Sequence, residues 1–302
     1  MSHILTIKSS ADSLKYQLFN ENNEELVSGY ISEAIDYQQA IKQVLRNIKD
    51  FHKVAAVGHY IAYGQEEFIK PVIVDENILT KIEEQSLNQD EIDEKNKKEF
   101  ESNLINVASI RACLEYLDLP QIAVFDTAFF DSLPEVSRMC LDRDEIPIHG
   151  LAHQGAMQFI AAKNKQKLSE VNIISCYLEN FGSVAAIKKG KPADISPSFF
   201  LISDNKDYKY FLKEATFSPE ARLTLDAFTF KIRKYIGSAL AVIQDEIDAI
   251  VLSGEVFIRQ PAIKQKITQG LDFFGKKVKV LVAESQEGLM IAKEVKKVLN
   301  AK

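Results

Sequence analysis

The sequence predicts an α/β protein built from two similar halves. Each half begins with two short strands joined by a turn. Each then continues with amphipathic helices that alternate with apolar runs of strand length. Continuous apolar runs are typical of parallel strands that are buried on both faces of a sheet. This repeated order indicates a duplicated architecture of two domains that flank a cleft.

In the first half, apolar and polar residues alternate from Leu14 to Leu18, the period of a half-buried strand. Ile41, Val44 and Ile48 share one side of a helix. The charge-rich stretch 75–100 is interpreted as a solvated helix or a mobile loop. The expected elements are strands at 4–7, 14–18, 25–31, 54–61 and 121–126, with helices at 34–48 and 103–117.

The second half repeats this order from the segment IISCYLENFGSVAAI, which reads as a hairpin. Its last helix is expected to be capped by Ser285, with Glu287 in the first turn, where the helix dipole favours a carboxylate. The expected elements are strands at 171–178, 183–191, 197–203, 247–254 and 277–283, with helices at 223–245, 262–270 and 285–300.

The segment IPIHG combines a proline and a glycine and marks the expected boundary between the halves. We therefore expect an N-terminal domain at 1–147 and a C-terminal domain at 148–284. A terminal helix at 285–302 is expected to pack back on the N-terminal domain.

The composition is that of a cytoplasmic globular protein. The chain of 302 residues is 46% hydrophobic and 26% charged, and its net charge of -6 argues against nucleic acid or an anionic membrane as a partner. No apolar run approaches the ~20 residues that span a bilayer, and the N-terminus lacks the features of a signal peptide. Cys113, Cys140 and Cys176 are far apart and form no CxxC, which fits a reducing compartment.

Eight segments occur in a characteristic order: SLKYQLF, VGHYIAYG, FIKPVIVDE, PQIAVFDTAF, IHGLAH, SVAAI, KIRKYIG and DAIVLSG. Together they resemble acetate kinase and its propionate and butyrate kinase relatives, within the actin-like and sugar-kinase-like ATPase superfamily. The resemblance covers nearly the whole chain. It implies two ribonuclease-H-like domains with an ATP cleft between them, a homodimer, and transfer of the γ-phosphoryl group of Mg-ATP to a small carboxylate, which gives an acyl phosphate.

The phosphate-binding turns implied by this resemblance have changed. Lys8 stands where the family has an asparagine, and is either a substitute phosphate ligand or a surface lysine beside Asp12. In the hairpin, Glu179 and Phe181 stand at two glycines that let the backbone approach the phosphates. The implied phosphate and nucleotide positions are Lys8, Ser10, Ser13, Asn180 and Gly254.

The implied substrate pocket has changed as well. Tyr60 replaces an arginine that holds the substrate carboxylate in the family, and tyrosine has no guanidinium fork for bidentate pairing. His59 is kept, either in the pocket or as a hydrogen-bonded structural histidine. Leu104 is equally a core leucine. The implied pocket residues are His59, Tyr60, Leu104 and Ile148.

Two polar positions of the implied phosphoryl-transfer site are kept. His149 matches the family histidine that contacts the transferring phosphoryl group. Asp126 ends a predicted strand, where ligands sit in open α/β sheets, although it is also a candidate for a cap or turn contact. His149 and His153 are four residues apart, which would place both on one helix face. The HExxH pattern is absent, so no metal ligands are predicted.

The family's Thr-Arg-Ser-Gly-Asp segment has no counterpart after KPADISPSFF. Its arginine stabilises the transition state, and losing an arginine finger in related chemistry costs roughly 10³ to 10⁵ in rate. The family's adenosine loop corresponds to Glu255–Arg259, with Ile258 at the metal-associated glutamate unless a small shift brings in Glu255.

These changes leave two hypotheses for the function of the protein. The first is an acetate-kinase-like pseudokinase, catalytically impaired, with a binding or regulatory role. The alternative is an active ATP-dependent carboxylate kinase with a remodelled site, carried by His149, Asp126 and Lys8. Mg-ATP is expected as a ligand only of the active enzyme. The expected partners are a second copy of the chain and a small molecule or protein of unknown identity, without nucleic acid or membrane.

Overall fold

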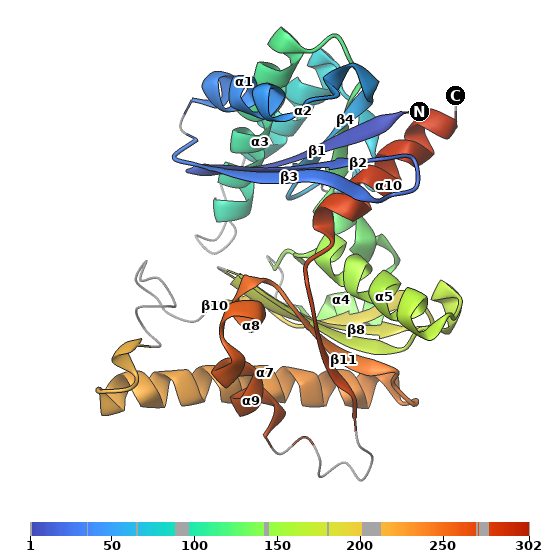
Figure 1. The fold of residues 1–302 in the computed structure, drawn as a ribbon. Coiled ribbons are helices and arrows are strands. Elements are labelled where there is room, and N and C mark those ends of the chain that lie inside the picture. The colour runs from blue at the N-terminus through green and yellow to red at the C-terminus, as the bar shows by residue number, and fades with distance from the viewer. Residues whose placement is uncertain are drawn as a thin grey trace. The chain divides into compact units, whose positions relative to one another are not determined.

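The structure is a computed structural model that describes residues 2–34, 36–64, 66–87, 97–141, 145–179, 181–200, 213–269, 271 and 278–301. It divides into two units, Met1–Asp131 with Gln286–Lys302, and Ser132–Ser285. We call these the N-terminal unit and the C-terminal unit. Each consists of a β-sheet with helices packed on both of its faces (Figure 1).

The sheet of the N-terminal unit has six strands in the order β3-β2-β1-β4-β6-β5. Strands β3, β2 and β1 are antiparallel, β1, β4 and β6 run parallel, and β5 is antiparallel to β6. The strands are β1 His3–Ser10, β2 Ser13–Phe19, β3 Glu25–Ser32, β4 Val54–Ile61, β5 Val72–Ile73 and β6 Gln121–Phe125. All were expected except β5, whose two residues are too few to show a period.

Helices cover both faces of this sheet. On one face, α3 packs on β1 and β4 and is itself packed against α1 and α2, while α10 packs on the opposite face. The α2 helix lies in the stretch expected to be solvated, yet Leu79 and Ile82 are buried in the core. One face of α2 is therefore core, because its apolar residues recur at helical spacing. The helices are α1 Tyr37–Asn47, η1 Phe51–Lys53, α2 Glu76–Leu87, α3 Lys97–Tyr116, η2 Asp126–Ser132 and α10 Glu287–Asn300.

The sheet of the C-terminal unit has the order β10-β8-β7-β11-β12, and β9 also pairs with β8. Strands β7, β11 and β12 run parallel, whereas β8 is antiparallel to β7, β9 and β10. The predicted hairpin is confirmed as β7 and β8. The strands are β7 Ile173–Leu178, β8 Phe181–Lys188, β9 Lys191–Ile195, β10 Phe199–Phe200, β11 Ala249–Ser253 and β12 Val280–Ala283.

The helices of this unit also lie on both faces of its sheet. The α5 helix packs on β7 and β11, and the opposite face is covered by α7, whose Phe228, Ile232 and Ile236 are buried in the core. The helices are α4 Glu135–Cys140, α5 Gly150–Asn164, η3 Leu168–Glu170, α7 Pro219–Ile243, α8 Glu255–Arg259 and α9 Pro261–Thr268.

The two sheets share one topology. The order β2-β1-β4-β6 corresponds to β8-β7-β11-β12, with an antiparallel hairpin followed by parallel strands in both units. In addition, α10 packs on one face of the first sheet and α5 on one face of the second. The predicted duplicated α/β architecture is therefore confirmed.

The division between the units falls ahead of the boundary that the sequence suggested at residues 147 and 148, since the units change between Asp131 and Ser132. Residues after Asp131 form hydrogen bonds with β9 and with the segment that follows it in the C-terminal unit. The Ser137 hydroxyl donates to the Asp194 carboxylate at 2.5 Å, and the Ser198 N–H donates to the Glu145 carboxylate at 2.8 Å.

The terminal helix packs in the N-terminal unit, but its start differs from the expected one. The N-cap position belongs to Gln286, whose side chain makes no cap bond, so the helix begins one residue later than a cap by Ser285 would place it. Glu287 does lie in the first turn. Its carboxylate receives a hydrogen bond from Lys8, a contact that sequence patterns of a single helix do not reveal.

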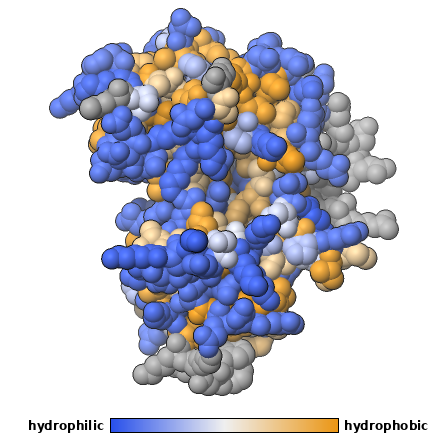
Figure 2. All heavy atoms as spheres, turned by 90° about the vertical axis from the view of Figure 1, so that its right-hand side faces the viewer, coloured by the Kyte–Doolittle hydropathy of each residue, from blue (hydrophilic) through white to orange (hydrophobic). Residues whose placement is uncertain are grey.

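Figure 2 shows hydrophilic side chains over much of the visible face, with apolar residues gathered in the upper part of the view. Among the described residues, no helix is both long enough and apolar enough to cross a bilayer.

Candidate functional site

The first candidate region lies at the end of the β1–β2 hairpin. Lys8 lies within β1 opposite Lys15, and the turn proper consists of Ala11 and Asp12. The hydroxyl groups of Ser10 and Ser13 lie within hydrogen-bond distance of each other, and the Ser10 hydroxyl also reaches the Ser13 carbonyl at 3.3 Å. The two serines that the sequence assigned to phosphate contacts are thus paired with each other.

Lys8 binds a residue that the sequence did not connect to it. Its ammonium donates to the Glu287 carboxylate at 2.7 Å and lies 4.7 Å from the centre of the Tyr60 ring. The Glu287 side chain is 6% exposed and that of Lys8 is 28% exposed. Glu287 also lies at the positive end of the α10 dipole, which favours its charge. Lys8 is therefore held by an ion pair with Glu287 and a contact with Tyr60.

His59 is held in the core of the N-terminal unit. The residue is 2% exposed, and its Nε2 lies 2.8 Å from the amide oxygen of Gln121. The Gln121 amide nitrogen donates to the Leu119 carbonyl, which fixes the amide so that Nε2 of His59 is the donor. Burial lowers the pKa of His59 to about 4. This environment matches the expected alternative of a hydrogen-bonded structural histidine.

Among the implied pocket residues, His59 and Tyr60 lie on opposite faces of the N-terminal sheet. His59 and Tyr60 are consecutive in β4, and successive side chains of a strand point to opposite faces of the sheet. His59 meets Gln121 of β6, whereas Tyr60 meets Lys8. Leu104 is half-buried on α3, and Ile148 belongs to the C-terminal unit.

Asp126 is fully buried at the start of η2, directly after β6. Its neighbourhood is braced by α3, where the Asn103 side chain accepts from the Tyr63 N–H at 3.2 Å and donates to the Tyr63 carbonyl at 2.8 Å. Asn106 donates to the Ser102 carbonyl at 2.7 Å, a local brace within α3. The role of Asn103 was missed, although an asparagine among the apolar positions of the predicted helix was a signal for it.

The second candidate region lies on the α5 face of the C-terminal sheet. His149 precedes α5 in a left-handed conformation with φ 66, and its Nδ1 lies 2.8 Å from the Ser183 hydroxyl. The His149 ring lies 4.5 Å from the Tyr177 ring, measured between centres. Ser183 and Tyr177 are paired across β7 and β8. His149 is thus positioned by the hairpin strands.

His153 joins the same cluster from the first turn of α5. Its Nε2 lies 2.9 Å from the Ser183 hydroxyl and its Nδ1 lies 2.8 Å from the Ser175 hydroxyl. Both histidines therefore converge on Ser183 instead of forming a pair on one helix face. Within the described ranges, no group of three or more histidine, cysteine, aspartate and glutamate side chains could hold a metal ion.

The turn of the β7–β8 hairpin is built with side chains at positions that are glycine in the family pattern. The Glu179 N–H donates to the Phe181 carbonyl at 3.1 Å, and neither residue has a positive φ. Phe181 pairs with Phe200 of β10, and Phe199 packs so closely on Gly182 that a Cβ there would lie 2.3 Å from its ring. Asn180 lies outside the described residues.

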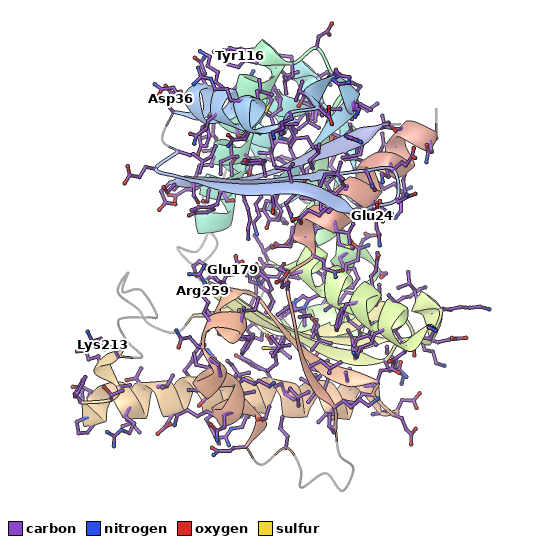
Figure 3. All side chains as sticks on the ribbon, in the orientation of Figure 1. Glu24, Asp36, Tyr116, Glu179, Lys213 and Arg259 are labelled. Atoms are coloured by element: carbon purple, nitrogen blue, oxygen red, sulfur yellow. The ribbon has the colours of Figure 1, made fainter. Side chains whose placement is uncertain are left out.

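Gly254 lies next to this hairpin. Its φ is 98, and a Cβ at this position would lie 2.3 Å from the Leu178 carbonyl oxygen. A glycine is therefore required here both for backbone conformation and for space. Gly254 precedes α8, in which Arg259 forms an ion pair with Glu255. Figure 3 labels Glu179 and Arg259 at the same end of the C-terminal unit.

The cysteines take no part in these regions as reactive groups. Cys113 and Cys176 are buried, and burial raises the pKa of both thiols. They stay protonated and pack as small apolar side chains. Cys140 is exposed on α4.

Comparison with known proteins identifies the family. The statistical model of the Acetokinase family matches residues 17–203 and 198–299. The chain belongs to the acetokinase family. It is 27% identical to acetate kinase of Thermotoga maritima over 407 aligned positions that cover 98% of both chains.

Solved structures support the acetokinase fold. An acetate kinase of Porphyromonas gingivalis superposes with a TM-score of 0.76 at 20% identity, covering 99% of this chain and 100% of that chain. A ROK family protein of Streptococcus pneumoniae gives a TM-score of 0.54 at 11% identity and covers 99% of both chains. These likenesses concern the fold alone.

The alignment also bears on the missing segment. At least 105 of the 407 aligned positions have no residue in this chain, the difference between 407 and its 302 residues. The family match is interrupted near residues 198–203, where its two parts meet. This interruption coincides with the point at which the family's arginine-containing segment has no counterpart in the sequence.

Proposed function

We propose that this acetokinase-family protein is a pseudokinase that keeps the kinase fold and has a binding or regulatory role. The observation that carries the proposal is the ion pair between Lys8 and Glu287. Lys8 stands where the family has a phosphate-binding asparagine, and its charge is neutralised by a carboxylate of the same unit. A phosphate group would have to displace this carboxylate, which lies at the N-terminus of α10.

Three further features support the proposal. Glu179 and Phe181 fill the hairpin turn, and a carboxylate there repels phosphate by about 4 kcal/mol at 4 Å and an effective dielectric of 20. Tyr60 provides no guanidinium for a substrate carboxylate. The arginine-containing segment is missing, and such an arginine is worth roughly 10³ to 10⁵ in rate. The described residues therefore do not fit Mg-ATP in the manner of the family.

The alternative is an active carboxylate kinase with a remodelled site. One observation favours it, namely that the phosphoryl-contacting position His149 is still anchored by Ser183. In that case His149 would stabilise the phosphoryl group, Asp126 would orient metal or substrate, and Lys8 would contact phosphate. The remaining proposed contacts would be Ser10, Ser13, Asn180 and Gly254, with a pocket of His59, Tyr60, Leu104 and Ile148.

The deciding experiment measures acyl phosphate formation from Mg-ATP with acetate, propionate and butyrate. Acetate kinase of Thermotoga maritima, assayed in parallel, is the positive control. The pseudokinase proposal expects no turnover above the background without protein. Turnover at the rate of the control enzyme would overturn it and establish the alternative.

Nucleotide binding separates the two proposals further. Thermal unfolding is followed with ATP, ADP, GTP and pyrophosphate, each with and without Mg²⁺. No stabilisation by any of them supports the pseudokinase, because a ligand that binds the folded state raises its stability. We further propose that the protein is a cytoplasmic homodimer, which light scattering after size exclusion would test by a mass of twice the 34.1 kDa chain.

A further inference from the structure

A continuous chain of hydrogen bonds links the two histidines of the C-terminal unit. It runs from the Ser175 hydroxyl to Nδ1 of His153 at 2.8 Å, from Nε2 of His153 to the Ser183 hydroxyl at 2.9 Å, and from there to Nδ1 of His149 at 2.8 Å. Ser175, His153 and Ser183 are each 0% exposed. The chain therefore connects the half-buried His149 to the interior of the unit.

The direction of the chain follows from the proton of Ser175. Within the described part of the protein, the hydrogen-bond partner of this hydroxyl is Nδ1 of His153. A buried O–H that donates to no acceptor costs the desolvation of that group. Ser175 therefore donates its proton, and Nδ1 of His153 accepts it.

The other positions follow from this first assignment. A neutral imidazole has one N–H and one acceptor nitrogen, so Nε2 of His153 carries the proton and donates to Ser183. A doubly protonated His153 would place a buried charge between two hydroxyls and leave the Ser175 proton without an acceptor. Ser183 then has its own proton to donate. His149 Nδ1 at 2.8 Å is a far better acceptor than the Ile148 carbonyl at 3.5 Å.

We propose that this one-way chain holds His149 as the neutral tautomer with its proton on Nε2. Ser175, His153 and Ser183 are positioning residues, because they act on a ligand through His149. In this tautomer the ring of His149 is neutral and its Nε2 is a hydrogen-bond donor. Its ring plane is fixed from one side by Ser183 and bordered by Tyr177. The inference goes beyond the proposed function, since it holds with or without phosphoryl transfer.

The test is the tautomer itself, read by nuclear magnetic resonance. Long-range proton–nitrogen correlation spectra are recorded on the full chain with nitrogen-labelled histidines, at about pH 8, above the ordinary imidazole pKa of about 6.5. His149→Gln and His153→Gln assign the signals by their loss. The expected result is a protonated Nε2 and a bare Nδ1 for both histidines. A protonated Nδ1 on His149 in the unsubstituted protein would overturn the proposal.

Substitutions within the chain sharpen the test. Ser183→Ala removes the donor to His149, so its signals are expected to move to the average of two exchanging tautomers. Ser175→Ala is expected to release the tautomer of His153. Ser253→Ala is the matched control, because Ser253 is buried next to Tyr177 in β11 and its hydroxyl has no partner among the described residues. An unchanged His149 spectrum in Ser183→Ala would contradict the assignment. If a variant fails to fold, the spectrum of the unsubstituted protein alone tests the proposal.

Discussion

The ammonium of Lys8 lies 2.7 Å from the carboxylate of Glu287, although 279 residues separate them in the sequence. The contact joins β1 to the first turn of α10 within one unit. It combines three favourable terms: opposite charges, a charge-assisted hydrogen bond and the dipole of α10. Because Lys8 stands at a phosphate-binding position of the family pattern, the same contact bears on both stability and ligand binding.

Glu287→Gln tests the strength of this contact. The substitution keeps the shape of the side chain and removes its charge, so Lys8 loses its ionic partner at a largely buried site. We expect the free energy of unfolding to fall by about 1–3 kcal/mol. The measurement is urea denaturation at neutral pH. Glu294→Gln is the matched control on α10, because its partner Lys297 is 68% exposed, and it is expected to cost at most about 0.5 kcal/mol. Equal losses in both variants would contradict the special role of Glu287.

His59 makes stability depend on pH. Burial lowers its folded-state pKa from 6.5 to about 4, so between these values the unfolded chain binds more protons than the folded one. The free energy of unfolding therefore falls as pH is lowered through this window, by about 3 kcal/mol from this residue. Denaturation curves between the two pH limits should show a shallower pH slope for His59→Gln. His52→Gln, at an exposed position, should keep the original slope. Parallel slopes for all three proteins would rule out this source of acid sensitivity.

Gly58 sets the distance between β4 and α10. A Cβ at this position would lie 2.6 Å from side-chain carbons of Ile291 and Val295. We expect Gly58→Ala to lower stability by about 1–3 kcal/mol and to speed hydrogen exchange in α10. Gly237→Ala is the control, since a Cβ there meets nothing within 4 Å on α7. It should raise stability by about 0.4–1 kcal/mol. A neutral result at Gly58 would mean that α10 shifts without cost.

Removing the side chains that fill the β7–β8 turn should partly restore nucleotide binding. Glu179→Gln removes the charge, whereas Phe181→Gly removes the bulk and also frees the backbone. Together they should tighten ADP binding at least tenfold in calorimetry, since a single like-charge contact at 4 Å can cost about 4 kcal/mol. They should not restore acyl phosphate formation, because the arginine-containing segment is missing. Unchanged ADP affinity in the double variant would show that the turn is not the obstacle.

Local sequence patterns predicted most of the fold. The alternation from Leu14 to Leu18, the apolar run 54–61 and the hairpin around Ser183 all correspond to observed strands. The misses have two physical causes: β5 is too short to show a period, and elsewhere the missing information lies in other parts of the chain. The first turn of α10 illustrates the second cause. Glu287 is bound by Lys8 of β1, which lies near the other end of the sequence, so helix-capping patterns do not predict this partner.

The candidate site was predictable in outline only. The family pattern singled out Lys8, His59 and His149, but not the residues that bind them. Sequence patterns assigned no role to three polar residues of buried strands, Gln121, Ser175 and Ser183. The hydrogen-bond partner of such a residue lies on a neighbouring strand or helix, so it becomes known only from the three-dimensional structure. Ser183 belongs to the segment SVAAI, which was part of the family resemblance. Its separation of 34 residues from His149 in the sequence does not indicate that the two side chains are in contact.

The return of α10 to the N-terminal unit has a consequence for synthesis. The C-terminal unit is continuous in sequence, whereas the N-terminal unit is interrupted by all of it. Domains generally fold during translation as their residues emerge. Here one face of the N-terminal sheet stays exposed until α10 has been synthesised, because Met290, Ile291 and Val295 of this helix bury it. The N-terminal unit therefore begins synthesis first but completes its folding last.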